Sequence, residues 1–499
     1  MTVKAIFPHS ELSYWLNIAE LLRDRYGWDI CYFAGIDDFR IKEAQEKFPD
    51  AVFHSIEQIK RGQIPYKCEK IKNAFLDEDL LSALAFHESI FIKMMDRHNI
   101  DGKLTYQKRI FYYHTQLMYW KGVLDYFKPD VLVFRVAPHR GYDYILYALC
   151  RVLGIKTMMF ERTSLPGRIY PVESFETGSE MIRDAYRKRL KDNNDNEIIL
   201  SQKTRDHIER LTQSYSQAMP FHLKYKLTKF KQGVLETLIL ISKDVIKGLL
   251  LRSKDPGYLR KSFYKNMGLF KRKRLLSRYN SLAKEVDMKK PYIFVALQCE
   301  PERQTCPNGG VFGNQYVMID LLSKLVPEGW MIYVKEHVSQ FKPYQAPERS
   351  KTVQFYDYIA NMPNVEFVPL SYTSFDMIDG AKASATVSGT VAWESVVRAK
   401  PALLFGYSWY RDGEGIFVTH NAHKCRRAIE KIENGYVVDR EKVLLFAQVI
   451  EENSFKGYID KLYDKMKIVT LDENVANMSM SIARFYEEAA GREKRAVLE

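Results

Sequence analysis

Short apolar runs alternate with longer stretches of helical periodicity over the first part of the chain. The apolar runs predict β-strands, and the stretches in which apolar residues recur every three or four positions predict helices. This alternation is typical of a parallel sheet covered by helices, so residues 1–215 are predicted to form one α/β domain. The predicted strands are residues 4–7, 29–33, 130–136 and 156–160, and the predicted helices are residues 12–26 and 142–153.

The same alternation restarts at about residue 291 and continues to about residue 425, which predicts a second domain of the same type. Residues 426–499 have a largely helical pattern. The predicted fold class is therefore α/β, with two Rossmann-like, doubly wound domains whose ligands bind at the carboxyl ends of the strands, in a cleft that the two domains share. The predicted strands are residues 292–297, 330–335, 365–368, 383–387 and 402–405, and the predicted helices are residues 315–325 and 390–398.

Between the two domains, residues 216–290 form a basic segment that is predicted to be helical. Residues 222–290 contain 19 Lys or Arg and 5 Asp or Glu, so this segment accounts for the whole formal net charge of +13. Apolar positions at near-helical spacing between Leu235 and Leu250 predict an amphipathic helix, and a compact basic cluster follows it. We expect the segment to dock on an anionic membrane surface; the alternative is a linker whose basic face is merely solvated. The expected membrane-binding residues are Lys271, Arg272, Lys273 and Arg274.

The composition is that of a soluble globular protein, with 46% hydrophobic and 27% charged residues. Six scattered cysteines suggest neither disulfides nor a structural zinc site, and no cofactor or metal is expected. The start of the chain lacks the pattern of a secretory signal, and charges interrupt the longest apolar stretch, residues 234–251. We therefore expect a cytoplasmic protein without a transmembrane helix. No nucleic-acid-binding module accompanies the basic charge, so nucleic acid is not an expected partner.

Three loops of the second domain follow predicted strands and carry candidate donor-binding residues. The first, residues 298–315, is glycine-rich; Gly309 and Gly310 would let backbone N–H groups approach a phosphate or sugar, or the loop is simply a surface loop. The second places Lys335, Glu336 and His337 at a strand end, where Lys335 and His337 are candidates to bind a phosphate and His337 is also a catalytic candidate.

The third loop contains Ser388, Gly389 and Thr390, with Glu394 about one turn into the following helix. Ser388 and Thr390 are good N-cap residues, and an anion could sit at the helix end while Glu394 reaches a sugar hydroxyl. The alternative is an ordinary capped helix with an acidic first turn.

In the first domain, His139, Asp143 and Glu161 follow predicted strands and are the candidates for a general base, a nucleophile or an acceptor clamp. Asp143 could equally cap the next helix, and Glu161 could pair with Arg162.

Residues 291–418 carry the patterns L-Q-x-E-P-E, P-x-G-G-x-F-x-x-Q, Y-V-K-E-H and S-G-T-x-A-W-E-S-V-x-R-x-K-P-A-L-x-F-G-Y-x-W-Y. In this order they resemble the bacterial capsule polysaccharide biosynthesis family, which includes Kdo transferases. The resemblance implies a GT-B arrangement. It places His337 and the turn at residues 388–390 near the donor phosphate, Glu394 near the ribose, and Gly309 and Gly310 along the cleft. One departure is Val338, where the family usually has proline.

These observations together predict a metal-independent glycosyltransferase of capsule or surface polysaccharide biosynthesis. The resemblance implies transfer of a sugar, with Kdo from CMP-Kdo the favoured donor, to a lipid-linked or glycan acceptor at the cytoplasmic face of the inner membrane. Two alternatives remain open: a nucleotide-sugar epimerase, which turns over without an acceptor, and a non-catalytic polysaccharide assembly or export protein, which binds a donor without turnover.

Overall fold

The computed structural model describes residues 2–65, 68, 71–99, 102–192, 197–218, 242, 246, 258–342, 346–460 and 468–498. The chain forms two compact units that are not continuous in sequence. Unit 1 consists of Met1–Ile92, Gln107–Leu200 and Leu445–Glu499, and unit 2 consists of Lys93–Tyr106 and Ser201–Leu444. This division differs from the predicted one, because residues 445–499 of the C-terminal helical region return to the first unit and residues 93–106 and 201–215 belong to the second.

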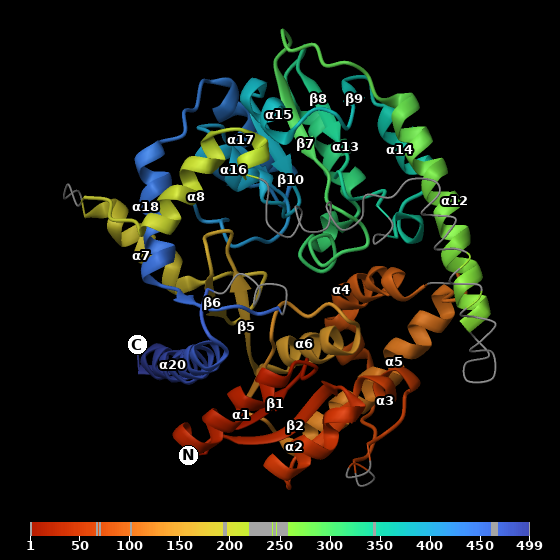
Figure 1. Ribbon diagram of the computed structural model, residues 1–499, viewed down its shortest axis with the longest axis vertical. Coiled ribbons are helices and arrows are strands. Elements are labelled where there is room, and N and C mark those ends of the chain that lie inside the picture. The colour runs from red at the N-terminus through yellow and green to blue at the C-terminus, as the bar shows by residue number, and fades with distance from the viewer. Residues whose placement is uncertain are drawn as a thin grey trace. The chain divides into compact units, whose positions relative to one another are not determined.

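Unit 1 is built on a seven-stranded sheet with the order β13-β6-β5-β4-β1-β2-β3 (Figure 1). Strands β1 to β5 are parallel, and all of them except β3 were predicted, whereas β6 and β13 are antiparallel and were not predicted. The parallel part has the strand order 3-2-1-4-5 of a doubly wound sheet. The strands are Lys4–Phe7 (β1), Asp29–Ile36 (β2), Val52–Ser55 (β3), Val131–Val133 (β4), Lys156–Arg162 (β5), Arg168–Val172 (β6) and Phe455–Lys456 (β13).

The helices of unit 1 cover this sheet, and the last of them comes from the C-terminal end of the chain. Helix α20 packs along α1, where Val475, Met478 and Ile482 join Trp15 and Ile18 in one buried hydrophobic cluster. The helices are Ser13–Tyr26 (α1), Ile41–Lys47 (α2), Ile56–Arg61 (α3), Glu78–Met94 (α4), Tyr106–Phe127 (α5), Tyr142–Leu153 (α6), Glu180–Lys191 (α7), Arg440–Glu452 (α18) and Leu471–Leu498 (α20).

Unit 2 is built on a six-stranded, fully parallel sheet with the order β12-β11-β10-β7-β8-β9. Numbered within the unit, this is the order 6-5-4-1-2-3 of the doubly wound fold, so the predicted fold class is confirmed for both units. The strands are Tyr292–Ala296 (β7), Met331–Lys335 (β8), Val365–Phe367 (β9), Ala383–Thr386 (β10), Ala402–Leu404 (β11) and Ile416–Val418 (β12).

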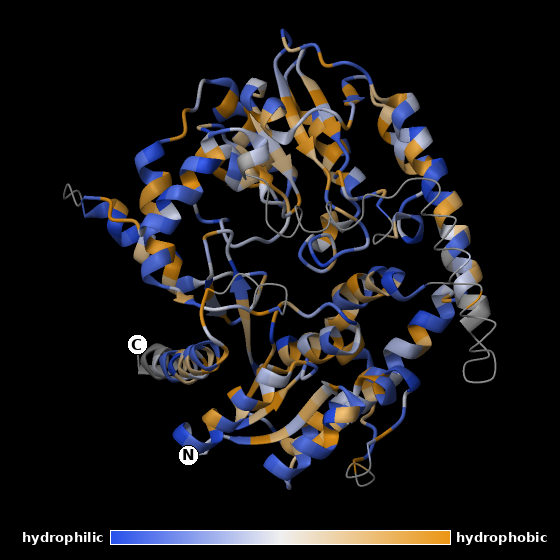
Figure 2. Ribbon diagram, in the orientation of Figure 1, coloured by the Kyte–Doolittle hydropathy of each residue, from blue (hydrophilic) through white to orange (hydrophobic). Residues whose placement is uncertain are grey.

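The strands of unit 2 are largely buried, apart from β12, and Figure 2 shows their apolar character. A hydrophobic cluster holds the helices against the sheet, with Ile293, Val334 and Leu403 from the strands at its centre. The helices of unit 2 are Gln202–Thr212 (α8), Tyr215–Ala218 (α9), Tyr258–Leu282 (α12), Gln315–Leu325 (α13), Val353–Ala360 (α14), Ser374–Gly380 (α15), Val391–Val397 (α16) and Ala422–Glu433 (α17).

Each sheet has one point at which the strand order reverses: between β1 and β4 in unit 1, and between β7 and β10 in unit 2. Loops that leave neighbouring strands there diverge to opposite faces of the sheet and leave a crevice at the carboxyl ends. These two points are where sheets of this type bind ligands.

The second half of the basic segment forms α12, which packs on α14 and β9 of unit 2. The expected amphipathic helix between Leu235 and Leu250 falls almost entirely outside the described residues. Among the helices that the structure describes, none is long and apolar enough to cross a membrane.

Candidate functional site

A pocket of about 90 Å³ opens in unit 2 at the carboxyl ends of its central strands. It lies at the point of strand-order reversal, where β7 and β10 are neighbours and β8 adjoins β7. Four of the predicted donor-binding residues line it, and Gln298 and Tyr215 join them. The polar and aromatic lining consists of Phe294 on β7 and Gln298 after it, Lys335, Glu336 and His337 at and after β8, Ser374 and Phe375 on α15, Thr390 and Glu394 at α16, and Tyr215 on α9.

Lys335 is the last residue of β8, and its side chain is only 5% exposed. Within the part of the chain that the structure describes, its ammonium group makes no hydrogen bond or ion pair. Burial lowers the pKa of Lys335 to about 8, although the charges of Glu336 and Asp376 partly oppose this shift. A buried cation without a hydrogen-bonded partner is costly, because the nearby charges of Glu336 and Asp376 only partly compensate for the loss of water. An anionic ligand in the pocket would supply the missing partner.

His337 lines the same pocket, and its ring is oriented by the loop after β8. Its Nδ1 accepts a hydrogen bond from the backbone N–H of Ser339 (3.1 Å) and lies 3.1 Å from the Cys299 thiol. Because Nδ1 is an acceptor, the proton of the neutral imidazole is on Nε2, and that N–H can donate to a ligand oxygen.

Glu336, between these two residues, differs from them because its carboxylate is bound by buried side chains of unit 2. Its carboxylate accepts hydrogen bonds from Lys351 Nζ (2.7 Å) and the Tyr356 hydroxyl (2.9 Å), and it is completely buried. All three of these residues line the pocket, but the carboxylate of Glu336 already has internal partners.

Two buried glutamines fix the loop after β7. Gln315, the first residue of α13, exchanges two hydrogen bonds with the backbone of Gln298 (2.7 and 2.9 Å), and Gln340 exchanges two with the backbone of Glu300 (2.9 and 2.8 Å). Each side-chain amide binds both the N–H and the C=O of one loop residue, as a neighbouring β-strand would. These bonds fix the loop although it is not part of the sheet. The glutamine that ends the pattern P-x-G-G-x-F-x-x-Q is therefore the residue that fixes the backbone of Gln298.

The loop after β10 differs from the predicted capped helix. Thr390 occupies the N-cap position of α16, but its hydroxyl donates to Glu394 (2.9 Å) and makes no capping bond. Ser388 donates to the backbone oxygen of Gln304 (2.6 Å). Glu394 lines the pocket; burial raises the pKa of its carboxyl group, and Thr390 and Arg398 partly oppose this. The arrangement turns the Glu394 carboxylate toward the pocket, where it can accept hydrogen bonds from hydroxyl groups.

Glycine is required at position 389 for a different reason than at positions 309 and 310. A Cβ at Gly389 would lie 2.0 Å from the side-chain nitrogen of Gln298, so only glycine lets that amide reach Thr386. Gly309 packs against the backbone oxygen of Thr305, and Gly310 lies against the ring of Tyr407. Neither Gly309 nor Gly310 lines the pocket.

Tyr215 was not predicted, because it lies far from the motifs in sequence. Its ring packs edge-on against Phe375, with ring centroids 5.4 Å apart. Arg398 holds this region together: it stacks on Phe375 (4.4 Å), pairs with Asp379, and donates to the backbone oxygens of Leu211 and Gln213. The end of α8 is thereby fixed beside the pocket, and no sequence signal at Tyr215 itself indicates this.

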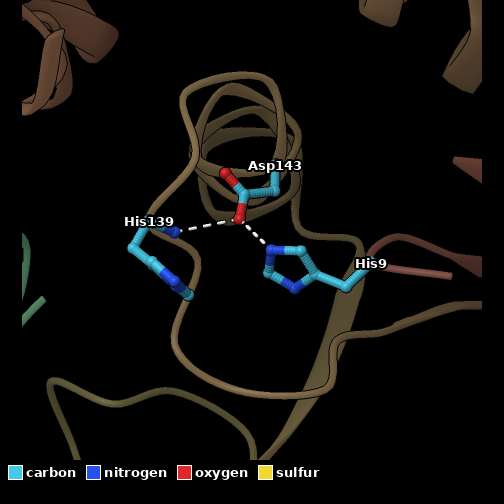
Figure 3. A group of neighbouring side chains, drawn as sticks. All are labelled: His9, His139 and Asp143. Atoms are coloured by element: carbon cyan, nitrogen blue, oxygen red, sulfur yellow. Dashed lines mark hydrogen bonds and ion pairs between the residues drawn. The ribbon is translucent and has the colours of Figure 1, made fainter. Parts of the chain in front are cut away.

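Unit 1 has its own polar cluster at the carboxyl ends of β1 and β4, formed by His9, His139 and Asp143 (Figure 3). Asp143 is completely buried in the first turn of α6. It accepts hydrogen bonds from the backbone N–H groups of His139 (2.9 Å), Arg140 (2.7 Å) and Tyr144 (2.7 Å), and pairs with the His9 imidazole. Burial would raise the pKa of Asp143, but His9 and these donors hold it below its usual range.

His9 was not predicted, although it is central to this cluster. It is fully buried, and its backbone has a φ of 68°, which is unusual for a residue with a side chain. Such a conformation persists only where its surroundings fix it. The contact of its imidazole with Asp143 is one interaction that fixes the side chain.

His139 is half-buried, and its Nδ1 donates to the backbone oxygen of Ala137 (2.9 Å). Since a carbonyl oxygen only accepts hydrogen bonds, Nε2 is the basic nitrogen of the neutral ring. Glu161 is also half-buried, but it lies inside β5, opposite Tyr170 on β6, and does not follow the strand as expected.

His9, His139 and Asp143 are spaced closely enough to hold a metal ion, because their ligand atoms lie within 4.8 Å of one another. The His9 imidazole contacts the carboxylate directly, however, and three N–H donors occupy the remaining acceptor positions of Asp143. The cluster therefore has the hydrogen bonding of a buried ion pair.

Comparisons with known proteins give distant structural matches only. No protein-family model matches the chain, and no curated protein matches it. A UDP-GlcNAc 2-epimerase from Methanocaldococcus jannaschii is 11% identical with a TM-score of 0.26, covering 91% of this chain and 99% of that chain. Thermosulfurimonas dismutans KpsC, a β Kdo 2,4 transferase, is 12% identical with a TM-score of 0.25, covering 64% and 79%. A glycosyltransferase from Rickettsia africae ESF-5 is 10% identical with a TM-score of 0.28, covering 95% and 99%.

Matches at this level assign neither an activity nor a substrate to this chain. The resemblance to the capsule polysaccharide biosynthesis family stays a prediction.

Proposed function

We propose that the protein is a glycosyltransferase that binds a nucleotide-activated sugar in the pocket of unit 2. The observation that carries this proposal is Lys335, a buried residue that lines the pocket and whose ammonium group has no hydrogen-bond or ion-pair partner among the residues that the structure describes. A donor phosphate would compensate it with a charge-assisted hydrogen bond. The carboxylate of Glu394 on the opposite side of the pocket suits a ribose or sugar hydroxyl.

The leaving group of the proposed reaction is the nucleotide phosphate. It gains negative charge as the bond between the sugar and the phosphate breaks. Lys335 and the Nε2–H of His337 are the groups proposed to stabilise that charge. A side chain that meets the charge mainly in the transition state contributes to the rate more than to binding.

The candidates for the base lie in unit 1, and we propose His139 for this role. Of the three candidates there, His139 is the group whose basic nitrogen is defined by a hydrogen bond at the other ring nitrogen. Asp143 already accepts three backbone hydrogen bonds and an ion pair, and we propose that it positions the loop that carries His139. Glu161 remains a candidate for binding the acceptor.

The sequence patterns favour a CMP-linked 3-deoxy sugar such as Kdo as the donor, and a lipid-linked or glycan acceptor of surface polysaccharide synthesis. The GT-B arrangement and a location at the cytoplasmic face of the inner membrane belong to the same proposal.

Incubation of the purified protein with CMP-Kdo and with UDP-sugars, with and without an extract of lipid-linked glycans, tests this function. We expect sugar transfer and nucleotide release that depend on the extract, and we expect His337→Ala to lower turnover more than donor affinity. Conversion of the donor without any acceptor would instead indicate an epimerase. Donor binding without turnover in every mixture would indicate a non-catalytic protein.

A further inference from the structure

Helix α12 has two faces of opposite character. Gly268, Arg272, Leu275 and Tyr279 follow one another at helical spacing and are all buried against unit 2. Arg272, although it lies in the predicted membrane-binding cluster, pairs with Glu348 (3.3 Å) and donates to the backbone oxygen of Lys342 (3.1 Å). That part of the sequence-based prediction is wrong, because the helix turns Arg272 inward.

The opposite face of α12 is apolar and exposed. Phe263, Met267 and Phe270 recur at the spacing that places residues on one side of a helix, and they are 60%, 39% and 69% exposed. Two large aromatic side chains and a methionine in one exposed line are unusual on a protein surface in contact with water, because the exposure of each apolar side chain to water costs free energy.

Exposed cations surround this apolar line. Arg274 continues it by one turn, while Lys271 and Lys273 flank it on either side. The whole helix contains eight Lys or Arg and no Asp or Glu. Apolar residues bordered by cations on one helix face are what a helix lying in the surface of an anionic bilayer presents.

We propose that the outer face of α12 docks on a membrane with anionic lipids, with Phe263, Met267 and Phe270 inserted among the acyl chains and Lys271, Lys273 and Arg274 at the headgroups. Charge complementarity selects this partner: a cationic rim without any acid suits a lipid surface that is uniformly anionic, and the apolar line suits its interior. The proposal deepens the membrane location proposed above; it needs no nucleotide, so a failure of nucleotide binding in the pocket would leave it standing.

Co-sedimentation of the full-length protein with vesicles tests this proposal. We expect binding to phosphatidylglycerol-containing vesicles at low salt, weaker binding at high salt, and no binding to pure phosphatidylcholine vesicles. A variant with Phe263→Ser, Met267→Ser and Phe270→Ser should partition at least about tenfold less strongly. A variant with Lys271→Ser, Lys273→Ser and Arg274→Ser should lose up to about a hundredfold at low salt.

Two matched controls distinguish a role of the outer face of α12 from the general effect of removing surface charge or an exposed aromatic side chain. Lys42→Ser, Lys188→Ser and Lys203→Ser remove the same charge from exposed positions elsewhere and should bind nearly as the wild type does. Phe111→Ser removes an aromatic side chain that is equally exposed on α5 and should have no effect.

A fluorescent label reports insertion directly. All six cysteines are buried, so a dye attached to Met267→Cys marks the outer face alone. Its emission should shift to the blue with anionic vesicles, whereas the same dye on Val437→Cys, another exposed position in unit 2, should not respond.

Three results would overturn the proposal. The wild type does not bind anionic vesicles at low salt; the serine variants of the outer face bind as strongly as the wild type; or the wild type is a dimer that the apolar variant converts to a monomer, with no vesicle binding by either. The last result would make this face a contact between copies of the chain.

Discussion

A single buried cation, Lys335, is the residue on which the proposed function depends most. The folded protein disfavours its charged form, so its pKa lies near 8, below the ordinary value of Lys. Between about pH 8 and 10.4, Lys335 is therefore protonated to a greater extent in the unfolded chain than in the folded one, and the contribution of Lys335 to the stability of the free protein becomes more favourable as the pH rises across this range.

Replacement of Lys335 by methionine should remove this effect. Lys335→Met keeps the length of the apolar stem and removes the charge, so we expect it to raise the free energy of unfolding at pH 7 by about 1–3 kcal/mol. Urea unfolding at pH 7 and pH 10 measures the change, which should be smaller at pH 10. A variant that is less stable than the wild type at pH 7 would mean that Lys335 has a stabilising partner.

The contact between His9 and Asp143 is the second residue-level feature that can be tested. Loss of one partner leaves the other buried and poorly compensated, so His9→Leu should lower the free energy of unfolding by about 2–4 kcal/mol. In a double-mutant cycle with Asp143→Asn, the two changes should be coupled by at least about 1 kcal/mol. Additive effects would show that the ion pair contributes nothing, and the positioning role of Asp143 would lose its basis.

The stability that Asp143 contributes has a defined dependence on pH. Since its folded-state pKa is lowered, this stability is present above the pKa of the unfolded chain, about 3.9, and is lost as the pH falls below it. His9→Leu should weaken that dependence.

At the scale of elements, the loops at the carboxyl ends of β7 and β10 meet where Gly389 lies against Gln298. A Cβ at position 389 would displace the flexible end of Gln298 and not the backbone, so Gly389→Ala should cost little stability, about 1 kcal/mol or less. It should nevertheless weaken nucleotide binding severalfold, because Gln298 lines the pocket.

Calorimetric titration together with thermal unfolding separates these two effects of Gly389→Ala. Gly491→Ala is the control, since nothing lies near its Cβ position. A variant at position 389 that binds as the wild type does would remove Gln298 from the proposed site.

The sequence predicts some of these elements better than others, for physical reasons. Parallel strands such as β8 are buried on both faces and form continuous apolar runs, so they are recognisable. Strand β6 contains a proline, and β13 has two residues and pairs with a segment almost 300 positions earlier, so neither has a local signal. Lys335, His337 and Glu394 were predicted to belong to a site because they follow recognisable strands.

Other site residues could not be predicted in this way. His9 is a lone histidine after a short strand, and only the fold brings it to Asp143. Tyr215 reaches the pocket through the contacts of Arg398. Arg272 was misassigned because a run of four basic residues suggests a surface cluster, whereas a helix turns one of the four inward. The sequence identifies the chemistry of single loops; tertiary packing decides which loops meet.

At the scale of the whole molecule, the chain crosses from unit 1 to unit 2 and returns, so unit 1 is completed only when α20 packs on α1. Met478 is fully buried in this contact, whereas Met480 on the same helix is 54% exposed. Met478→Asp should therefore lower the stability of unit 1 by about 3 kcal/mol or more, and Met480→Asp should leave it nearly unchanged.

Hydrogen exchange, measured as the temperature is raised, distinguishes the unfolding of the two units in this experiment. Unit 1 should lose protection first in Met478→Asp, while β7 and β8 of unit 2 stay protected. Equal effects of the two aspartates would contradict the packing of α20 described above.

The central claim is that the pocket of unit 2 binds a nucleotide through Lys335, and calorimetric titration of nucleotides into the wild type and into Lys335→Met tests it most directly. We predict that CMP or UDP binds the wild type and that the folded variant binds it at least about tenfold more weakly, since a charge-assisted hydrogen bond contributes roughly 1.5–3 kcal/mol. Equal affinity in the two proteins, or no binding of either nucleotide to the wild type, would contradict it.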